Sequence, residues 1–392
     1  MQSFEFYSPT RVVFGPGREA EVGRLAQEQG ATTVMLVYGG ASALRSGLID
    51  RIEASLAASG IRSFRFGGAK PNPQLAHARE GIRLALEEKA DLILGIGGGS
   101  SIDTAKAIAL GAANPELDIW EIWLKRMPLK TVLPIGAVPT IAAAGSEMSD
   151  SAVLDDDAQA LKRGYGSDYI RPTFAVLDPE LPCTLPRYQI ACGVVDVMMH
   201  TMDRYFNPIT TNMLTDEIAE GVLRTTIANG RVAVDDPENV QAMSELMWCS
   251  CLSHNNLTGL GGMLDFAPHQ LGHELSAEFD VAHGASLSAV WASWARYCVK
   301  TNPDRFVRFG KKVWGLDGEG LDGANHAIDV TEQLFRELDM PTCFSELGIG
   351  MKNEWELARM AQGCSFDGKR TIGKFRVLDQ DDMLRIYQMA NH

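Results

Sequence analysis

The sequence lacks a long apolar run and has no cluster of basic residues. Its longest nearly apolar stretch, about residues 132–144, is too short to cross a bilayer and is interrupted by Pro134 and Pro139. The formal net charge is −14, from 36 Lys and Arg against 50 Asp and Glu. We do not expect so acidic a chain to bind nucleic acid or an anionic membrane surface. The N-terminus has neither the basic start nor the apolar segment of a signal peptide.

The C-x-x-C motif of many metal and redox sites is also absent. The seven cysteines are scattered, and none belongs to a C-x-x-C pair. An odd number of scattered cysteines is typical of reduced thiols that fill a core, which predicts a cytoplasmic protein rather than a disulfide-bonded secreted one.

Lysine and arginine are missing from one long segment, between Arg231 and Arg296. A phosphorylated or carboxylated substrate is normally held by such cations. Since Met263, Phe266 and Phe279 lie in the same segment, the sequence predicts an apolar substrate pocket there. A cation from another part of the chain or from another subunit would change that prediction.

The chain length and the order of strand and helix patterns along the chain predict two domains. A chain of 392 residues exceeds a single ordinary core, and its 45% apolar and 22% charged residues are typical of a globular protein. In the first half, short apolar strands alternate with amphipathic helices, which indicates a doubly wound α/β domain with a mostly parallel sheet. The expected strands cover residues 11–14, 33–37, 61–66, 91–96, 131–135 and 174–177. Strand patterns stop near Pro186, so we expect domains 1–186 and 187–392, the second all-helical.

A glycine turn ends the fourth expected strand and opens a helix. Glycine lets the backbone approach a ligand closely, and the N–H groups of a first helical turn point at an anion. The pattern is neither G-x-G-x-x-G nor a Walker loop, and such turns also occur without a ligand. The order of strand, glycines, serine and helix nevertheless favours a pyrophosphate site. The residues of this turn are Gly97, Gly98, Gly99 and Ser100.

A second turn, from Tyr38 to Arg45, follows the strand at residues 33–37. Sites that select NAD usually place an acidic residue beside the adenosine ribose, and no acid lies between Val37 and Arg45. Small residues, the Ser42 hydroxyl and Arg45 would suit the additional 2′-phosphate of NADP. The turn could also be purely structural, but its composition favours NADP(H) over NAD(H).

Two pairs of polar residues stand four apart in apolar surroundings. Asp196 and His200 form one pair, and His269 and His273 form the other. Residues four apart share one helix face, so two such helices could hold a metal between them, and imidazole and carboxylate are ligands of Zn²⁺ and Fe²⁺. A lone buried histidine usually has only a hydrogen-bond partner, but a set of buried polar groups needs several partners. Spacing does not decide which of His269, His273 and His283 bind.

Taken together, these residues resemble those of the metal-dependent, group III or iron-containing, alcohol dehydrogenases. The resemblance covers nearly the whole chain, from residues 8–15 through the glycine turn to residues 283–284. The individual glycine motifs are weak, whereas the ordered set is specific. Residues 38–42 and 272–275 are similar to the branch that contains butanol dehydrogenases and NADPH-dependent aldehyde reductases.

The resemblance implies a role for each candidate residue. His273 would be a histidine near the nicotinamide that does not bind the metal. The metal ligands would be Asp196, His200, His269 and His283. The cofactor-binding residues would be Tyr38, Gly39, Ser42, Gly97, Gly98, Gly99, Ser100, Asp103, Thr140, Ser149 and Lys162.

Three positions depart from the family pattern. Ala144 stands where threonine is frequent, which removes one hydroxyl contact to the cofactor. Asp203 stands where glutamate usually follows the helix histidine, and Phe266 stands where tryptophan is common, which affects the shape of the substrate site. None of the implied metal ligands is lost.

The resemblance implies reversible hydride transfer between a primary alcohol or aldehyde and a nicotinamide cofactor. It further implies a dehydroquinate synthase-like architecture, a homodimer, NADP(H) with NAD(H) as the alternative, and one divalent metal, Fe²⁺ or Zn²⁺. His273 would either relay a proton or orient the nicotinamide or substrate. The alternatives are a glycerol dehydrogenase, a dehydroquinate synthase-type enzyme and a non-catalytic dinucleotide-binding protein. The missing cations disfavour the anionic substrate of the synthase type.

Overall fold

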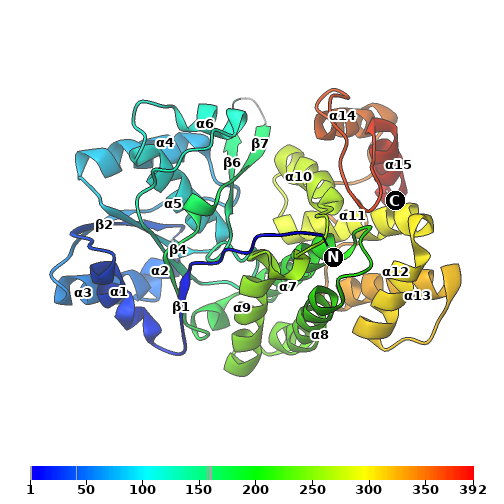
Figure 1. Ribbon diagram of the computed structural model, residues 1–392, viewed down its shortest axis with the longest axis horizontal. Helices are drawn as coiled ribbons and strands as arrows, with labels where there is room; N and C mark the ends of the chain where they lie inside the picture. The colour runs from blue at the N-terminus through cyan, green and yellow to red at the C-terminus, as the bar shows by residue number, and fades with distance from the viewer. Residues whose placement is uncertain (1, 41, 157, 159–160) are drawn as a thin grey trace. The chain divides into compact units, whose positions relative to one another are not determined.

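The computed structural model describes residues 2–40, 42–156, 158 and 161–392. These residues form two compact units (Figure 1). The first unit contains Tyr7–Thr184 and Glu238–Cys251, and the second contains Leu185–Pro237, Leu252–His392 and the described residues before Tyr7. The division into domains 1–186 and 187–392 stays a prediction.

A parallel sheet of six strands lies at the centre of the first unit. Its order is β1-β8-β5-β4-β2-β3, and all neighbouring strands in it are parallel. This confirms the predicted doubly wound α/β class. The strands are β1 (Arg11–Phe14), β2 (Thr33–Tyr38), β3 (Arg62–Phe66), β4 (Leu92–Gly97), β5 (Ile135–Pro139) and β8 (Phe174–Leu177).

Helices cover both faces of this sheet (Figure 1). Val34 and Leu36 of β2 pack with α1 (Val22–Glu28) and α3 (Leu48–Ala58), whereas Met35 and Val37 pack with α4 (Leu75–Glu87) and α5 (Gly99–Ala112). Alternate side chains of a strand point to opposite faces, so burial of both faces explains why all of β2 is buried. The helices are α1 (Val22–Glu28), α2 (Ser42–Arg45), α3 (Leu48–Ala58), α4 (Leu75–Glu87), α5 (Gly99–Ala112) and α6 (Ile119–Lys125).

Two features of the first unit differ from the expectations. The prediction of a strand at residues 131–135 was wrong, because β5 begins only at Ile135. Thr131 is exposed and residues 132–134 are partly buried, whereas every residue of β5 is buried between its neighbours. The antiparallel pair β6 (Ser151–Asp156) and β7 (Leu161–Gly166) was not expected, since acidic, basic and glycine residues obscure its strand pattern.

The second unit is helical in its described residues, apart from one isolated bridge between Ile372 and Leu378. Helix α9 (Val240–His254) passes from the first unit into the second. None of the described helices is both long enough and apolar enough to cross a membrane. The other helices are α7 (Arg187–Tyr205), α8 (Met213–Asp235), α10 (Ala267–Phe279), α11 (His283–Cys298), α12 (Pro303–Phe309), α13 (Gly320–Glu337), α14 (Glu354–Cys364) and α15 (Gln380–Ala390).

Single helical turns connect several of these elements. In the described part of the chain, η1 to η5 are 3-10 turns, and η6 is a π turn that continues α12. They are η1 (Arg18–Glu21), η2 (Asp168–Ile170), η3 (Leu181–Thr184), η4 (Leu257–Gly259), η5 (Val299–Thr301) and η6 (Gly310–Trp314).

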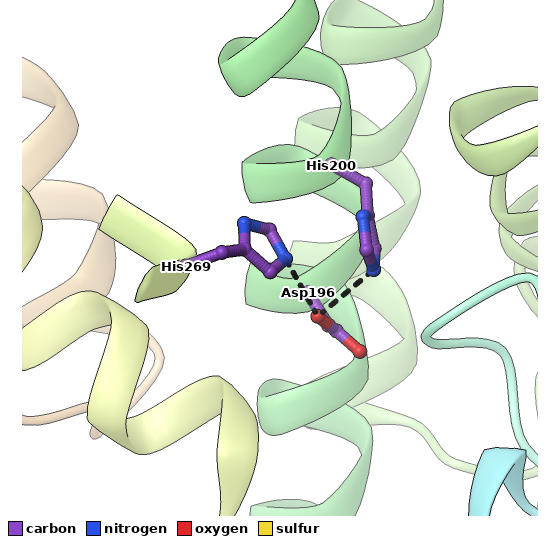
Figure 2. Close-up of side chains that lie close together, drawn as sticks. All are labelled: Asp196, His200 and His269. Atoms are coloured by element: carbon purple, nitrogen blue, oxygen red, sulfur yellow. Dashed lines mark ion pairs between the residues drawn. The ribbon is translucent and has the colours of Figure 1, made fainter. Parts of the chain in front are cut away.

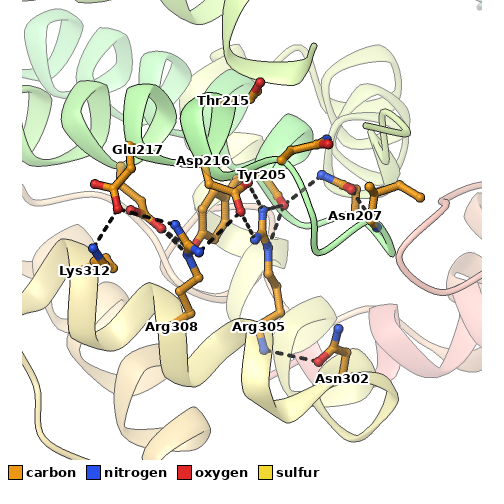
Figure 3. Close-up of polar contacts among 12 residues, drawn as sticks. Tyr205, Asn207, Thr215, Asp216, Glu217, Asn302, Arg305, Arg308 and Lys312 are labelled. Carbon is orange, nitrogen blue, oxygen red and sulfur yellow. Dashed lines mark hydrogen bonds and ion pairs between the residues drawn. The ribbon is translucent and has the colours of Figure 1, made fainter. Parts of the chain in front are cut away.

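A buried ion pair fixes the C-terminal end of α7 (Figure 3). The Arg305 side chain of α12 lies 2.6 Å from the carboxylate of Asp216 on α8. Its Nε also donates to the backbone carbonyl of Tyr205, the last residue of α7, at 3.0 Å, and the guanidinium lies 3.7 Å from the centre of the Tyr205 ring. A charge buried in this way needs its partner, so three helices are held together at the end of α7.

Candidate functional site

Helix α7 places Asp196 and His200 on one buried face. Every residue of this helix from 193 to 205 is buried. Asp196 is 4% and His200 is 5% exposed, and His200 Nε2 lies 3.6 Å from Asp196 Oδ1. The spacing of four residues therefore brings the two side chains together as the sequence predicts.

Two further histidines approach the same carboxylate oxygen from other helices. Pro268 lies in the first turn of α10, and it is followed directly by His269, whose Nε2 lies 4.0 Å from Asp196 Oδ1. Helix α11 begins at His283, whose Nε2 lies 3.5 Å from the same oxygen. Figure 2 shows the His200 and His269 rings converging on Asp196.

This arrangement fits a divalent metal. An ion held at about 2.0–2.2 Å from each of several ligands places neighbouring ligand atoms roughly 3–4 Å apart. Ligand atoms of Asp196, His200 and His269 all lie within 4.8 Å of one another. Nε2 of the buried His269 has no hydrogen-bond partner among the described residues, and burying such an atom costs free energy. A metal bound to this nitrogen would remove the cost.

The buried histidines are held in the neutral form that donates a lone pair. Burial lowers the pKa of His269 to about 3, and the nearby Arg204 charge acts in the same direction. Burial also lowers the pKa of His200 well below its ordinary value, together with the neighbouring histidines and Arg204. Arg204 is itself buried and donates to the His200 backbone carbonyl at 2.7 Å. A neutral imidazole is the form that binds a metal.

His273 lies beside this group. Its ring centre is 6.2 Å from that of His269 and 5.2 Å from that of His283. Among the described residues, the group whose ligand atoms lie within 4.8 Å of one another comprises Asp196, His200 and His269. His273 and His283 are therefore neighbours of that group, and His283 Nε2 lies 3.5 Å from Asp196 Oδ1.

The glycine turn forms the expected junction between strand and helix. Strand β4 ends at Gly97, and α5 begins at Gly99. Gly97 has a φ of 136°, and a Cβ atom there would lie 2.7 Å from Ser101 Oγ, so only glycine fits. The Thr140 N–H donates to the Gly97 carbonyl at 3.0 Å, which brings the loop after β5 to this turn. The first turn of α5, with Gly98 preceding it and Ser100 within it, can present N–H groups to an anion.

The turn after β2 lies next to the glycine turn. The Gly68 N–H donates to the Gly39 carbonyl at 3.0 Å, and the Ala69 N–H donates to the Tyr38 carbonyl at 3.1 Å. A Cβ atom on Gly39 would lie 3.5 Å from a side-chain oxygen in the first turn of α5. The ends of β2, β3 and β4 thus meet at the carboxyl edge of the sheet, where such folds bind ligands. Ser42 opens α2, and position 41 lies outside the described residues.

The three remaining cofactor candidates make contacts within the protein. Asp103 accepts hydrogen bonds from a serine hydroxyl and from a backbone N–H of β6. The Ser149 hydroxyl accepts from the buried Lys106 at 3.0 Å, and burial lowers the pKa of Lys106 to about 8. Lys162 donates to Asn72 at 2.7 Å. Asp103 and Ser149 therefore hold the segment after β5 against α5, and their contact with a cofactor stays a prediction.

Comparison with protein families decides the identity of the chain. The model of iron-containing alcohol dehydrogenases matches residues 9–179, and the model of the C-terminal part of the Fe-containing alcohol dehydrogenase family matches residues 190–391. The chain belongs to the iron-containing alcohol dehydrogenase family. It is an NAD(P)-dependent alcohol dehydrogenase, and its buried Asp–His–His group fits the metal that the family uses.

Relatives of this dehydrogenase match it from end to end. NADH-dependent butanol dehydrogenase A from Clostridium acetobutylicum is 37% identical over 100% of both chains. NADPH-dependent aldehyde reductase YqhD from Escherichia coli is 33% identical over 100% of both chains. The crystal structure of NADH-dependent butanol dehydrogenase A from Thermotoga maritima has a TM-score of 0.96 at 32% identity, covering 100% of this chain and 99% of the other. These relatives confirm the predicted branch of the family.

Asp203 orients the His269 ring in this dehydrogenase. Asp203 Oδ2 lies 2.5 Å from His269 Nδ1, and the Asp203 backbone carbonyl accepts the Asp265 N–H at 2.9 Å. Burial raises the pKa of Asp203 well above its ordinary value, while the charge of Arg204 opposes this change. A metal on Nε2 would leave the imidazole proton on Nδ1, where it donates to Asp203. The shorter aspartate thus still reaches the ring.

Asp203→Asn is expected to weaken metal binding about 10–100-fold, because an amide oxygen is a weaker acceptor for the His269 Nδ1 proton than the Asp203 carboxyl group. Competition with a chromogenic chelator would measure the dissociation constant. Asp317→Asn is a suitable control, since Asp317 is exposed. Equal metal affinity in the two variants would contradict the orienting role of Asp203.

One histidine near the site was not predicted. His254, the last residue of α9, stacks on His200 with ring centres 4.0 Å apart and ring planes inclined by 22°. No pattern in the sequence indicates this contact, because His254 is far from His200 along the chain and has no second histidine at helical spacing.

Proposed function

We propose that this dehydrogenase reduces aldehydes to primary alcohols with NADPH and catalyses the reverse oxidation with NADP⁺. The convergence of three imidazole nitrogens on Asp196 Oδ1, at 3.5–4.0 Å, carries this proposal. The proposed ligands of one Fe²⁺ or Zn²⁺ ion are Asp196, His200, His269 and His283. A set of one carboxylate and three imidazoles accepts both ions, and Zn²⁺ generally binds such sites more tightly than Fe²⁺.

The metal would supply Lewis acidity, which polarises an aldehyde carbonyl or acidifies an alcohol hydroxyl. Asp196 contributes the single negative charge of the ligand set, and the neutral histidines add none. Phe266 lies edge-on to the rings of His200 and His269, with centres 6.3 and 5.2 Å away. An apolar ring beside the ligands, in a segment without Lys or Arg, favours an uncharged substrate. The Arg204 guanidinium, which comes from α7, lies 4.9 Å from the centre of the Phe266 ring, but it is buried and donates to the His200 backbone carbonyl.

We assign the dinucleotide to the carboxyl edge of the parallel sheet. The glycine turn would bind the pyrophosphate and the turn after β2 would bind the adenosine ribose. The absence of an acid between Val37 and Arg45 supports NADP(H), with NAD(H) as the alternative. The proposed set is Tyr38, Gly39, Ser42, Gly97, Gly98, Gly99, Ser100, Asp103, Thr140, Ser149 and Lys162.

His273 is the proposed proton donor to the alcohol oxygen formed during reduction. Its ring neighbours those of His269 and His283. His273→Ala is expected to lower kcat about 100-fold, because a positioned acid typically contributes at least that much, while the metal content stays unchanged. The exposed His326 provides the control variant His326→Ala. Loss of metal from His273→Ala would contradict its assignment as a residue that does not bind the ion, and an unchanged kcat would contradict the proton-donor role.

We further propose that the protein is a cytoplasmic homodimer. Each of its chains would consist of domains 1–186 and 187–392. None of the seven cysteines forms a disulfide bond, which supports a reducing compartment. The aromatic side chains of Phe4, Phe6 and Tyr7 are 51%, 43% and 52% exposed, which supports an interface at the N-terminal segment. Analytical ultracentrifugation would measure the mass in solution, and a monomer would overturn the dimer.

The test of the proposed function measures oxidation of NADPH and NADH with a series of short aldehydes. The assay is repeated after chelation and after Fe²⁺ or Zn²⁺ is restored. We expect turnover that is lost on chelation, regained with metal and faster with NADPH. No turnover with any aldehyde, despite bound metal and dinucleotide, would overturn the proposal, whereas a higher kcat/KM with NADH would overturn only the cofactor preference.

A further inference from the structure

We propose that His254 positions the metal ligand His200 by stacking on its imidazole ring. The inference rests on the proposed metal site. His254 would act through His200 and would not bind the ion itself, so it is a positioning residue.

The two buried ligand rings are held in different ways. His269 has Asp203 at 2.5 Å from its Nδ1. His200 Nδ1 is buried and has no hydrogen-bond partner among the described residues. A ligand imidazole usually owes its orientation to a hydrogen bond made by the nitrogen that does not bind the metal. The His200 ring therefore needs a different restraint.

Ring stacking can supply this restraint. Of the ring contacts that His200 makes with described residues, the one with His254 has the shortest centre-to-centre distance, 4.0 Å, and the smallest inclination, 22°. The His269 ring is tilted by 38° at 4.3 Å, and Phe266 is inclined by 65° at 6.3 Å. Rotation of the His200 ring about its Cβ–Cγ bond would drive it into the parallel His254 ring, so this contact opposes rotation most directly.

The local sequence fixes the place of His254. It ends α9 and is followed by Asn255, which is buried and accepts the Leu257 N–H at 3.0 Å. Asn256 then adopts the left-handed conformation, with a φ of 77°. The backbone therefore turns directly after His254, since asparagine tolerates this conformation better than most residues. His254 is presented from the end of a helix and from a hydrogen-bonded turn rather than from a long loop.

Stacking also suits the electronic state of a ligand imidazole. A metal on Nε2 draws electron density from the ring, and a neighbouring aromatic face stabilises a positive ring. The contact should therefore contribute to metal affinity as well as to ring orientation. An aromatic replacement of His254 should preserve both effects, and a small or non-aromatic replacement should lose them.

Three substitutions separate stacking from hydrogen bonding. His254→Ala removes the ring, His254→Asn retains a hydrogen-bonding group without a ring, and His254→Phe retains a ring without nitrogen. The readouts are the Zn²⁺ dissociation constant, from chelator competition, and the visible spectrum of the Co²⁺-substituted protein. We expect Ala and Asn to raise the dissociation constant about tenfold and to alter the spectrum, and Phe to stay within about threefold of the wild-type protein.

Leu252→Ala, a truncation of a partly buried residue on the same helix, is the matched control and should leave the dissociation constant unchanged. The unfolding temperature of the metal-free variants shows whether each is folded. A wild-type dissociation constant in His254→Ala would overturn the proposal, and so would an equal loss in His254→Phe and His254→Ala. Tight Zn²⁺ binding that survives Asp196→Ala would instead overturn the proposed metal site, so the two failures are distinguishable.

Discussion

Asp196→Ala is expected to remove the bound metal and to lower kcat/KM about a thousandfold or more, the loss of several kcal/mol of transition-state stabilisation. Asp196 Oδ1 is the atom that all three proposed histidine ligands approach, at 3.5, 3.6 and 4.0 Å. It also carries the only charge of the proposed ligand set. Removing it leaves neutral imidazoles, which hold a divalent ion less tightly than a set that includes a carboxylate.

Metal analysis of the purified variant and steady-state kinetics would measure these two effects. The chelated wild-type protein should regain activity when Fe²⁺ or Zn²⁺ is added, whereas Asp196→Ala should not. The exposed Asp317 provides the control Asp317→Ala, which should retain both metal and activity. One equivalent of tightly bound metal in Asp196→Ala would refute the ligand assignment.

Gly284→Ala is expected to lower the free energy of unfolding by about 3 kcal/mol, at the upper end of overpacking effects. A Cβ atom on Gly284 would lie 2.2 Å from the backbone oxygen of Cys192 and 2.8 Å from its Cα and carbonyl carbon. These are backbone atoms of α7, which cannot rotate away as a side chain can. The start of α11 would therefore have to move away from α7.

The same substitution should weaken metal binding. His283 precedes Gly284, and its Nε2 lies 3.5 Å from Asp196 of α7, so separating the helices would withdraw one proposed ligand. Chemical denaturation of the metal-free protein and chelator competition would measure the two effects separately. Metal affinity that is unchanged in Gly284→Ala would contradict the assignment of His283 as a ligand.

Gly221→Ala is the matched control for this prediction. Gly221 lies in the interior of α8, and a Cβ atom there would meet only the end of the Arg224 side chain, at 3.9 Å. Alanine in an open helical position should stabilise the protein by about 0.5–1 kcal/mol, because glycine loses more backbone entropy on folding. A loss of stability in Gly221→Ala would show that glycines in the helices of the second unit contribute to the free energy of unfolding for reasons other than close packing.

Much of the fold could be predicted because its patterns are local. The continuous apolar run of β2 and the spacing of Asp196 and His200 each depend on a few neighbouring residues. The start of β5 could not be predicted from the local apolar pattern, since residues 132–134 are apolar but only partly buried. The start of helix α15 carries a local signal of the same kind, the reciprocal hydrogen bonds between Asp379 and Asp382.

The composition of the proposed metal site is less accessible to sequence patterns. His269 and His273 have the same spacing as the pair on α7, so periodicity alone would favour both as ligands. His283 approaches Asp196 because α11 begins at His283 and packs closely on α7 at Gly284. This contact joins two helices that are far apart in the sequence. His254 reaches His200 for a similar reason, at the end of a helix that carries no repeated histidine pattern. The family resemblance, rather than spacing, selected His283.

The convergence of α7, α10 and α11 on one carboxylate oxygen affects the amount of this enzyme that a cell maintains. A metal bound there ties together segments that the unfolded chain does not hold in place, so the ion binds the native state far better than the unfolded one. Above the dissociation constant, each tenfold rise in free metal then adds about 1.4 kcal/mol to the free energy of unfolding. A metal-starved cell will therefore contain a larger unfolded fraction, which proteases remove. From the proposed metal site we therefore expect enzyme abundance to follow metal supply even when the rate of synthesis is constant.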